Sequence, residues 1–214
     1  MEITLLYRDQ SIVLCEKPIG ISSEHPGLPD LISQQIQAPV YPVHRLDQGT
    51  GGVCALALSG KCCARMQQLF QSDSVRKEYD AVFSGIPSGD DGVMTDFLYH
   101  DPGKNKSFVV RSERRGVRRA ECEWKLIETA EFEGEKLSWI RVTLHTGRTH
   151  QIRVQFSSRG MPLVGDRKYG SRIRASSPAL WSARLCFPHP EADRIVDISS
   201  RPPEVFPWSE FRRP

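Results

Sequence analysis

Short stretches in which apolar residues alternate with polar ones, or follow each other without interruption, predict most of the strands of this chain. Residues 4–20 read as two strands around a central Asp-Gln turn. Residues 52–59, GVCALALS, form a continuous apolar run, which indicates a strand buried on both faces. Alternation over 75–85 predicts a further strand, and two more are expected at 118–129 and 136–145.

Helical spacing of apolar residues occurs in three other stretches. Residues 29–36 begin near Asp30, which we expect to cap a short helix. Residues 60–73 repeat apolar side chains three and four positions apart. Residues 148–160, RTHQIRVQFSSRG, look helical, and Gly160 is expected to close the helix. The proline-rich C-terminal third is expected to hold loops and short strands. This order of elements predicts an α+β fold with a mixed, mainly antiparallel sheet and flanking helices and loops.

The length of 214 residues is sufficient for one domain with a substantial core, undivided or made of two lobes, and we expect a single domain over residues 1–214. No apolar run approaches the roughly 20 residues that span a bilayer. The N-terminus lacks a basic region followed by an apolar one, so we expect a cytoplasmic protein without a membrane partner. The six cysteines include no C-x-x-C pair, so we expect reduced thiols rather than zinc or disulfides.

Positive charge is concentrated in one stretch of the chain. The net charge of +3 leans only slightly toward anionic partners. Residues 111–119, RSERRGVRR, carry five arginines around a glycine. This stretch is either the solvated tip of a hairpin or a loop that contacts phosphate groups, and charge alone does not separate the two.

Three further motifs each allow a structural and a chemical interpretation. In HRLDQGTGG, residues 44–52, Asp47 precedes glycines, and such an aspartate is usually a turn residue. In RTHQIR, residues 148–153, two arginines beside a helix start can bind phosphate, although an exposed basic helix is a fair competitor. In RKEYDA, residues 76–81, Tyr79 is either a core residue of a strand or an aromatic surface for a nucleobase.

Together and in this order, the motifs resemble the RluA-type RNA pseudouridine synthase family. The resemblance rests on KPIG (17–20), HRLDQGTGG (44–52), RKEYDA (76–81), GRTHQIRVQF (147–156) and GDRKYG (165–170). It covers about residues 10–187, and HRLD with RTHQIR in one chain is highly specific. The resemblance implies the pseudouridine synthase catalytic fold and an enzyme that isomerises uridine in structured ribosomal or transfer RNA. We expect the chain to consist of the catalytic domain alone, without the S4-type RNA-binding domain of some family members.

The resemblance also implies roles for particular residues. Asp47 matches the family's catalytic aspartate, Arg153 the arginine that pairs with it, and Tyr79 the aromatic residue that packs on the target base. Arg45 matches an arginine that can enter the space left by the flipped base, and Lys17 belongs to a structural motif near the site. The residues expected to contact RNA are His44, Arg45, Lys77, Arg148, Thr149, His150 and Gln151, with Arg114, Arg115, Arg118 and Arg119 of the arginine-rich stretch. No metal or organic cofactor is required, and the implied partner is RNA, bound by a monomer.

The implied reaction explains why a carboxylate would stand between an arginine and glycines. Pseudouridine formation breaks the N1–C1′ bond of a uridine, rotates the base and rejoins it through C5, so the nucleotide must first leave the stack. Asp47 can attack C1′, attack C6 or remove a C2′ proton, and the sequence leaves these routes open. A paired Arg153 keeps the carboxylate ionised in a dry pocket. The glycines after Asp47 are expected to let the RNA backbone approach closely.

Three positions depart from the family's pattern. Gln155 stands where a histidine is common, Cys122 where a threonine is usual, and Gly51 where the family's T-S-G has serine. We expect these departures to affect the choice of substrate more than the activity.

Two other functions remain open. The chain could be an RNA-binding protein that keeps this fold and remodels RNA without chemistry, although the presence of Asp47, Tyr79 and Arg153 argues against this. It could also hydrolyse nucleosidic or glycosidic bonds, a reaction that generally takes two carboxylates. Asp166 of GDRKYG is the candidate second acid, but we interpret it as a turn residue.

Overall fold

The computed structural model describes residues 1–212, which form two compact units. Unit 1 comprises Met1–Glu78 and Trp181–Pro202, and unit 2 comprises Tyr79–Leu180 and the segment from Pro203 onward. The chain passes between the units within strands β5 (Arg76–Ser84) and β10 (Leu180–Pro188). The expected α+β class with a mixed sheet is confirmed. The single domain over residues 1–214 stays a prediction, and residues 213–214 lie outside the described part.

Unit 1 is built on the strands predicted from residues 4–20 and 52–59, joined by strands from the C-terminal third. Its strands are β1 (Leu5–Arg8), β2 (Ile12–Lys17), β3 (Tyr41–Pro42), β4 (Gly51–Ala57), β10 and β11 (Ile195–Ser199). They follow the order β1-β2-β4-β10, with β11 beside β10 and β3 beside β4. The β4–β10 pair is parallel and the other pairs are antiparallel. All residues of β4 are buried, which confirms a strand covered on both faces.

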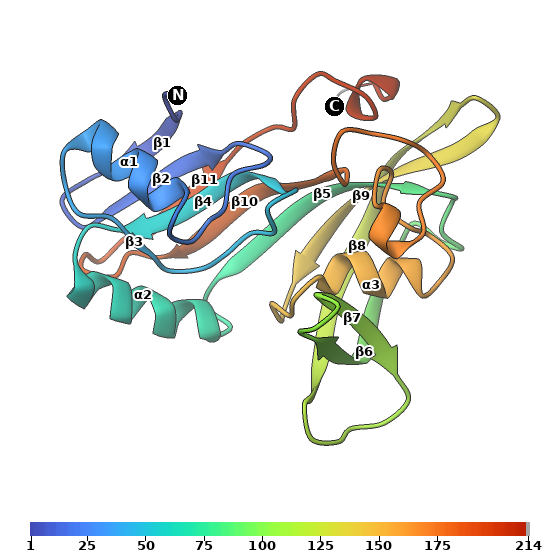
Figure 1. Cartoon of the computed structure of the whole chain (residues 1–214), viewed down its shortest axis with the longest axis horizontal. Helices are drawn as coiled ribbons and strands as arrows, with labels where there is room; N and C mark the ends of the chain where they lie inside the picture. Colours follow the sequence, from blue (N-terminus) through green and yellow to red (C-terminus); the bar gives the residue numbers. More distant parts are fainter. Residues whose placement is uncertain (213–214) are drawn as a thin grey trace. The chain divides into compact units, whose positions relative to one another are not determined.

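Two helices flank these strands, α1 (Leu28–Ile36) above and α2 (Gly60–Gln71) below in Figure 1. Cys62 and Met66 of α2 join a core cluster with apolar residues of β2, β4 and β10. The hydroxyl of Ser59 caps α2 by accepting the Cys62 amide at 3.1 Å. In α1 the cap position is Gly27 rather than the expected Asp30. Asp30 lies three residues further on, where its carboxylate accepts the Gly27 amide at 2.8 Å.

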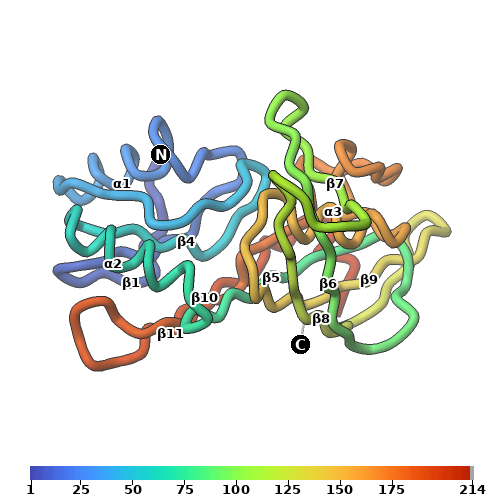
Figure 2. The backbone as a smooth tube through the Cα atoms, turned by 90° about the horizontal axis from the view of Figure 1, so that it is seen from below, coloured from blue at the N-terminus to red at the C-terminus, as the bar shows by residue number. Residues whose placement is uncertain are grey.

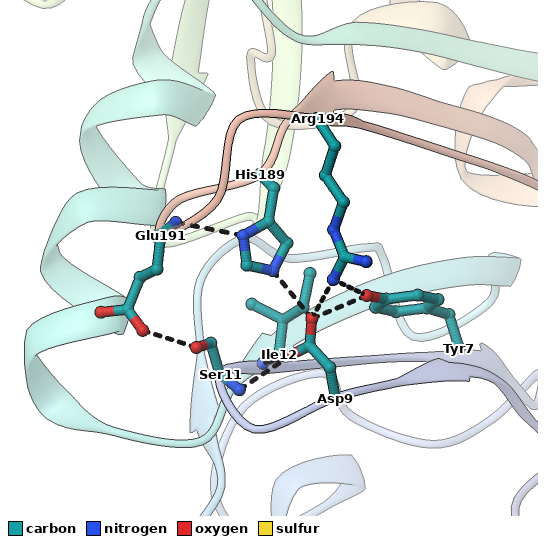
Figure 3. Close-up of polar contacts among 7 residues, drawn as sticks. All are labelled: Tyr7, Asp9, Ser11, Ile12, His189, Glu191 and Arg194. Atoms are coloured by element: carbon teal, nitrogen blue, oxygen red, sulfur yellow. Dashed lines mark hydrogen bonds and ion pairs between the residues drawn. The ribbon is translucent and has the colours of Figure 1, made fainter.

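The carboxylate of Asp9 holds the turn between β1 and β2 against the turn between β10 and β11 (Figure 3). Its Oδ1 accepts two amides of its own turn at 2.8 and 2.9 Å. Its Oδ2 accepts the Tyr7 hydroxyl at 2.6 Å and the Arg194 guanidinium at 2.7 Å, and lies 2.8 Å from Nε2 of His189. Nδ1 of His189 accepts the Glu191 amide at 3.1 Å, so Nε2 carries the proton and donates it to Asp9.

We expect Asp9→Asn to lower the free energy of unfolding by about 3 kcal/mol at neutral pH, because the hydrogen bonds to a charged oxygen are lost. Burial alone would raise the pKa of the Asp9 carboxyl, but the hydrogen bonds from Tyr7, the turn amides and His189 hold it well below its usual range. A depressed carboxyl pKa stabilises the folded state above the unfolded-state pKa of about 4, and this contribution is lost as the pH falls further.

Urea unfolding of wild type and variant at a series of pH values measures this contribution. The difference between the two proteins should be constant near neutral pH and shrink below a pH of about 4. Asp193 is an exposed acid in the turn between β10 and β11, and it provides the matched control. An equal loss of stability in Asp193→Asn would contradict a specific role of Asp9.

Unit 2 is built on antiparallel strands, of which β8 is the longest. They are β5, β6 (Asp91–Asp101), β7 (Lys106–Val110), β8 (Val117–Phe132) and β9 (Glu135–Leu144), in the order β5-β9-β8-β6-β7, with 3-10 turns at Arg167–Tyr169 and Trp208–Glu210. Figures 1 and 2 show β8 and β9 side by side as one long hairpin. The strands expected at 75–85, 118–129 and 136–145 are confirmed.

The helix of unit 2 is shorter than the expected stretch of residues 148–160. α3 spans Gln151–Ser157, and His150 precedes it with a left-handed φ of 57°. The helix is anchored by Phe156, whose ring stacks on that of Phe83 with centroids 4.0 Å apart. Gly160 follows with a φ of 80° and donates its amide back to the last helical turn at 3.0 Å, as expected for a closing residue.

Candidate active site

Asp47 lies in unit 1, in the loop that leads into β4. The loop closes with a turn in which the Thr50 amide donates to the Asp47 carbonyl at 2.9 Å. The preceding residue, Leu46, is 6% exposed and anchors the loop in the core of the unit. Asp47 itself is half-buried. The carboxylate is therefore carried by a defined turn with an apolar anchor beside it.

The glycines at the end of this loop serve the packing of the protein itself. A Cβ at Gly51 would lie 2.3 Å from Cζ3 of the Trp181 ring. Gly52 has a φ of 105°, and its Cβ would lie 2.3 Å from the Ser182 carbonyl oxygen of β10. These two glycines therefore allow β4 to pair closely with β10, and the expectation that the glycines of this loop also let the RNA backbone approach stays a prediction.

His44, expected to contact RNA, is held by the scaffold of unit 1. Its Nε2 accepts the Ala55 amide at 3.0 Å, and its ring stacks on Phe70 with centroids 4.6 Å apart. Burial, with a contribution from the charge of Lys77, lowers the pKa of the imidazole to about 3. A neutral His44 therefore fixes the beginning of the HRLD motif to β4 and α2, and its contact with RNA stays a prediction.

Lys77 also has an internal partner. Its ammonium donates to the Phe70 carbonyl at 3.2 Å and lies 6.0 Å from the centroid of the Phe70 ring. A cation is favourable at this end of α2, where the last carbonyls carry partial negative charge. Burial lowers the pKa of the Lys77 ammonium, and the charge of Asp73 acts in the opposite direction. The structure thus places Lys77 at the end of α2, and its contact with an RNA phosphate stays a prediction.

Arg45 is the exposed basic residue of the HRLD motif. Its side chain is 60% exposed, and Nη1 lies 3.8 Å from a carboxylate oxygen of the equally exposed Glu24. An ion pair of this length between exposed groups contributes little to stability. The guanidinium is accessible to a large partner, as its expected role requires.

Arg153 of α3 forms a buried ion pair within unit 2. Its Nε and Nη2 donate to the carboxylate oxygens of Asp166 at 2.6 and 3.0 Å. The two side chains are 11% and 1% exposed. The guanidinium also lies 5.1 Å from the centroid of the Tyr169 ring. This bidentate contact fixes the plane of the guanidinium and directs its remaining N–H groups away from Asp166.

Asp166 is the partner of Arg153 that the sequence interpretation missed, because an aspartate after glycine is usually a turn residue. The available signal was the GDRKYG motif, which places an acid and an aromatic residue three positions apart, as on one side of a helical turn. Both residues of the motif contact Arg153.

Tyr169 connects the start of α3 to β7. Its hydroxyl accepts the Ser107 amide at 2.7 Å and lies 3.0 Å from Nδ1 of His150, to which it can donate its single hydrogen. The Ser107 hydroxyl donates to the Thr149 carbonyl at 2.6 Å. Burial raises the pKa of the Tyr169 hydroxyl, which therefore keeps its hydrogen and can donate it to His150. His150 and Thr149, expected to contact RNA, thus join this internal network.

Gln151 closes the turn before α3. Its Oε1 accepts the Arg148 amide at 3.1 Å and the Thr146 hydroxyl at 2.8 Å, and its Nε2 donates to the Glu121 carbonyl at 3.1 Å. The exposed Arg148 donates from Nε to the Arg119 carbonyl at 3.0 Å. The turn uses these groups internally, and phosphate binding by the arginines of this motif stays a prediction.

The two departures from the family's pattern in unit 2 contact each other. Sγ of Cys122 on β8 lies 3.6 Å from Oε1 of Gln155, and both residues are fully buried. Nε2 of Gln155 donates to Asp96 at 2.8 Å, and Asp96 also pairs with Arg159 at 2.9 Å. Burial raises the pKa of Cys122 to about 12, so the thiol stays neutral. Cys122 and Gln155, the two residues that depart from the family's pattern, are thus part of the packing of α3 on β6 and β8.

The arginine-rich stretch forms an exposed turn between β7 and β8. The Val117 amide donates to the Arg114 carbonyl at 3.0 Å, and Gly116 has a φ of 83°. Arg114 and Arg115 are exposed in this turn, and Arg118 and Arg119 are exposed at the start of β8. Arg119 also pairs with Glu121. The stretch is not the tip of a hairpin, because β7 and β8 do not pair with each other and β6 lies between them. Its contact with phosphate groups stays a prediction.

Tyr79 lies at the start of the unit 2 part of β5 and is 8% exposed. This burial agrees with its interpretation as a strand residue of the core. Asp47 belongs to unit 1, whereas Tyr79 and Arg153 belong to unit 2. The joint action of the three residues is therefore a prediction that rests on the motifs.

Among residues 1–212 there is no group of three or more His, Cys, Asp or Glu side chains arranged to hold a metal ion. The six cysteines are thiols. None of the helices in this part of the chain is long and apolar enough to cross a membrane.

Comparison with known proteins identifies the family. A family model described as RNA pseudouridylate synthase matches residues 11–158. An uncharacterized RNA pseudouridine synthase of Aquifex aeolicus is 29% identical, over 99% of this chain and 74% of that protein. Ribosomal large subunit pseudouridine synthase D of Zymomonas mobilis is 27% identical, over 94% of this chain and 70% of that protein. The solved structure of Human RNA Pseudouridylate Synthase Domain Containing 1 shares the fold, with a TM-score of 0.83 and 20% identity over 97% of this chain and 86% of that one. The chain belongs to the RNA pseudouridylate synthase family and is of the RluA type.

Proposed function

We propose that the chain converts specific uridines of structured RNA to pseudouridine, with Asp47 as the catalytic carboxylate. The observation that carries the proposal is the HRLD turn, which presents Asp47 within the residues that match the family model. The reaction is an isomerisation, so no atom has to be supplied or removed except the exchanging hydrogen at C5.

The proposed roles follow from the steps of this reaction. Flipping a uridine out of its stack costs a few kcal/mol, and the exposed Arg45 can occupy the space that is left. Tyr79 supplies an aromatic face for the base. Arg153 keeps Asp47 ionised, because a nearby cation favours the charged form of a carboxylate. Attack at C1′, attack at C6 and removal of the C2′ proton all require this ionised form.

The buried ion pair of Arg153 and Asp166 argues against the alternative function of a hydrolase of nucleosidic or glycosidic bonds. A glycosidic hydrolase generally needs a second acid that can exchange a proton. Asp166, the candidate for that role, is 1% exposed and holds Arg153 through both of its oxygens. Its carboxylate is committed to orienting a guanidinium, which leaves the isomerase and the RNA-remodelling protein as the functions to distinguish.

The proposed substrate is ribosomal or transfer RNA. One relative is named for the ribosomal large subunit, which supports ribosomal RNA as the first class to test. The proposal includes a monomer that acts in the cytoplasm without a protein partner, because the motifs with proposed roles all lie in one chain.

The arginine-rich turn should contribute to RNA affinity through phosphate contacts. Replacing Arg114, Arg115, Arg118 and Arg119 with serine is expected to weaken RNA binding and to reduce the slope of log K against log salt by up to about 3. Filter binding over a range of salt concentrations measures both quantities. Replacing Arg172 and Arg174, which are also exposed in unit 2, removes two charges elsewhere and is the control for a variant that loses only Arg114 and Arg115. Unchanged affinity in the variant that carries the four serines would reject this role.

The release of tritium from RNA labelled at uridine C5 tests the function. C5 loses its hydrogen when it becomes bonded to the ribose, so isomerisation must release the label. Unmodified ribosomal and transfer RNA are assayed separately with the wild-type chain. Release from one class supports the isomerase and identifies its substrate class. Binding without release from either class would favour the RNA-remodelling protein.

A further inference from the structure

The helix that carries Arg153 is too short to be stable by itself. α3 spans seven residues, Gln151–Ser157, and isolated helices shorter than about 12 residues are marginal in water. Its position in unit 2 therefore depends on contacts with the segments around it. On the side of Arg153, the guanidinium pairs with Asp166, and the Ser157 hydroxyl donates to the Tyr169 carbonyl at 2.6 Å.

Asp96 of β6 holds the other side of this helix. Gln155 follows Arg153 by two residues, which places its side chain about 200° further around the helix. Nε2 of Gln155 donates to Oδ2 of Asp96 at 2.8 Å. Nη1 and Nη2 of Arg159, just beyond the helix, donate to the two oxygens of the same carboxylate at 2.9 and 3.2 Å. One carboxylate of the sheet thus accepts hydrogen bonds from α3 and from the turn that follows it.

Gln155 is the residue through which this contact reaches the helix. It is fully buried, and the Cys122 thiol of β8 donates to its Oε1 at 3.6 Å. Nη1 of Arg159 also donates to the Gln155 carbonyl at 3.0 Å. Because the two ends of the amide are engaged by two different strands, its orientation is fixed. α3 is therefore joined to both β6 and β8 at this position.

We propose that Asp96 is a positioning residue for the reaction, which sets the direction of the Arg153 guanidinium by holding the opposite side of α3. The inference rests on the proposed function. A helix that is held on one side alone can turn about that contact, and a displacement of about 1 Å near the reacting groups can cost about 100-fold in rate. Loss of the Asp96 contacts should therefore reduce kcat more than it changes RNA binding.

The test compares Asp96→Ala, which removes both acceptor oxygens, with Asp96→Asn, which keeps one of them and the size of the side chain. Asp9→Asn is the matched control, because it removes hydrogen bonds to a charged oxygen in unit 1. Tritium release at saturating RNA gives kcat, its dependence on RNA concentration gives KM, and thermal unfolding gives stability. All activities are measured well below each variant's unfolding temperature.

We expect Asp96→Ala to lose about 100-fold in kcat with little change in KM, and Asp96→Asn to lose less. Asp9→Asn should lose stability but keep kcat. An aspartate that serves only the fold would leave kcat at the wild-type value in the folded Asp96→Ala variant, and this result overturns the proposal.

A double-variant cycle tests whether the effect of Asp96 passes through Arg153. Arg153→Lys keeps the positive charge but cannot form the bidentate contact with Asp166. If Asp96 acts by setting the guanidinium, Asp96→Ala should lower kcat much less in the Arg153→Lys background than in the wild type. Equal losses in the two backgrounds would mean that the two residues act independently, and this would also overturn the proposal.

Gln155→Met decides the question if Asp96→Ala does not fold, because it removes the donor to Asp96 and leaves the ion pair with Arg159 in place. An unchanged kcat in Gln155→Met would then overturn the proposal, and a fall in kcat at constant KM would support it. If the wild-type chain releases no tritium from any RNA, the proposed function fails and the inference fails with it. Wild-type release together with unaffected Asp96 and Gln155 variants removes the inference alone.

Discussion

Asp47→Asn is expected to abolish tritium release from C5-labelled RNA while RNA affinity stays nearly unchanged. An amide cannot act as nucleophile or base at the ribose or the base, so every route open to Asp47 is lost. Removing an essential catalytic group typically lowers kcat on the order of 10⁴-fold or more. Affinity should persist because it depends mainly on contacts with phosphate groups. The substitution preserves the size of the side chain and the turn that the Thr50 amide closes onto the residue 47 carbonyl.

The measurement pairs tritium release with filter binding on the same RNA preparation. Asp193→Asn serves as the control, because it removes an exposed carboxylate of unit 1 that is remote in sequence from the HRLD motif. Parallel loss of release and binding would mean that Asp47 acts in binding or folding. Retained release would exclude Asp47 as the catalytic carboxylate.

The second large effect is expected at the ion pair of Arg153 and Asp166 in unit 2. Asp166→Ala leaves a buried guanidinium without the carboxylate that accepts two of its N–H groups. Such a loss costs about 3–5 kcal/mol in the free energy of unfolding. Activity should fall as well, because the plane of the Arg153 guanidinium is no longer fixed. Urea unfolding and tritium release measure the two effects.

An exposed ion pair provides the control for stability. Arg184 and Asp197 form a comparable contact with side chains 37% and 42% exposed, and Asp197→Ala should cost less than about 1 kcal/mol. A double variant, Arg153→Met with Asp166→Leu, should regain much of the stability because no buried charge remains. It should stay inactive if Arg153 is needed for the reaction. An active double variant would show that the pair serves the fold alone.

The strands and helices that the sequence predicts correctly are those in which the apolar residues of the pattern are also the buried residues of the structure. β4 is apolar throughout and buried throughout, and α2 repeats its apolar residues at helical spacing. β6 shows why the remaining strands could not be predicted. Its buried residues, Met94 and Leu98, share one face of the strand, but apolar residues such as Val93 and Phe97 lie on the other face. Apolar and polar residues therefore do not alternate along this stretch of sequence. Its strand structure comes from pairing with β7 and β8, and such pairing leaves no local signal.

The motifs located Asp47 and Arg153, but they could not show which polar residues face inward. His44 and Gln151 stand in motifs beside exposed arginines, yet each is engaged by backbone groups of other segments. The ion pair of Arg153 likewise depends on a later segment, because the chain folds back after α3 and places Asp166 beside the guanidinium. Whether a basic or amide side chain contacts RNA or another part of the protein depends on which distant segments fold back beside it. The spacing of residues in the sequence does not show this.

The close approach of Gly51 and Trp181 has a consequence for the evolution of the family. The ring of Trp181 occupies the space in which a Cβ at position 51 would lie, so the glycine and the tryptophan form one steric unit divided between β4 and β10. The family's T-S-G pattern, with serine at this position, is incompatible with an indole in the same place. The two positions should therefore covary, and relatives that carry serine at the first should carry a smaller or differently directed side chain at the second.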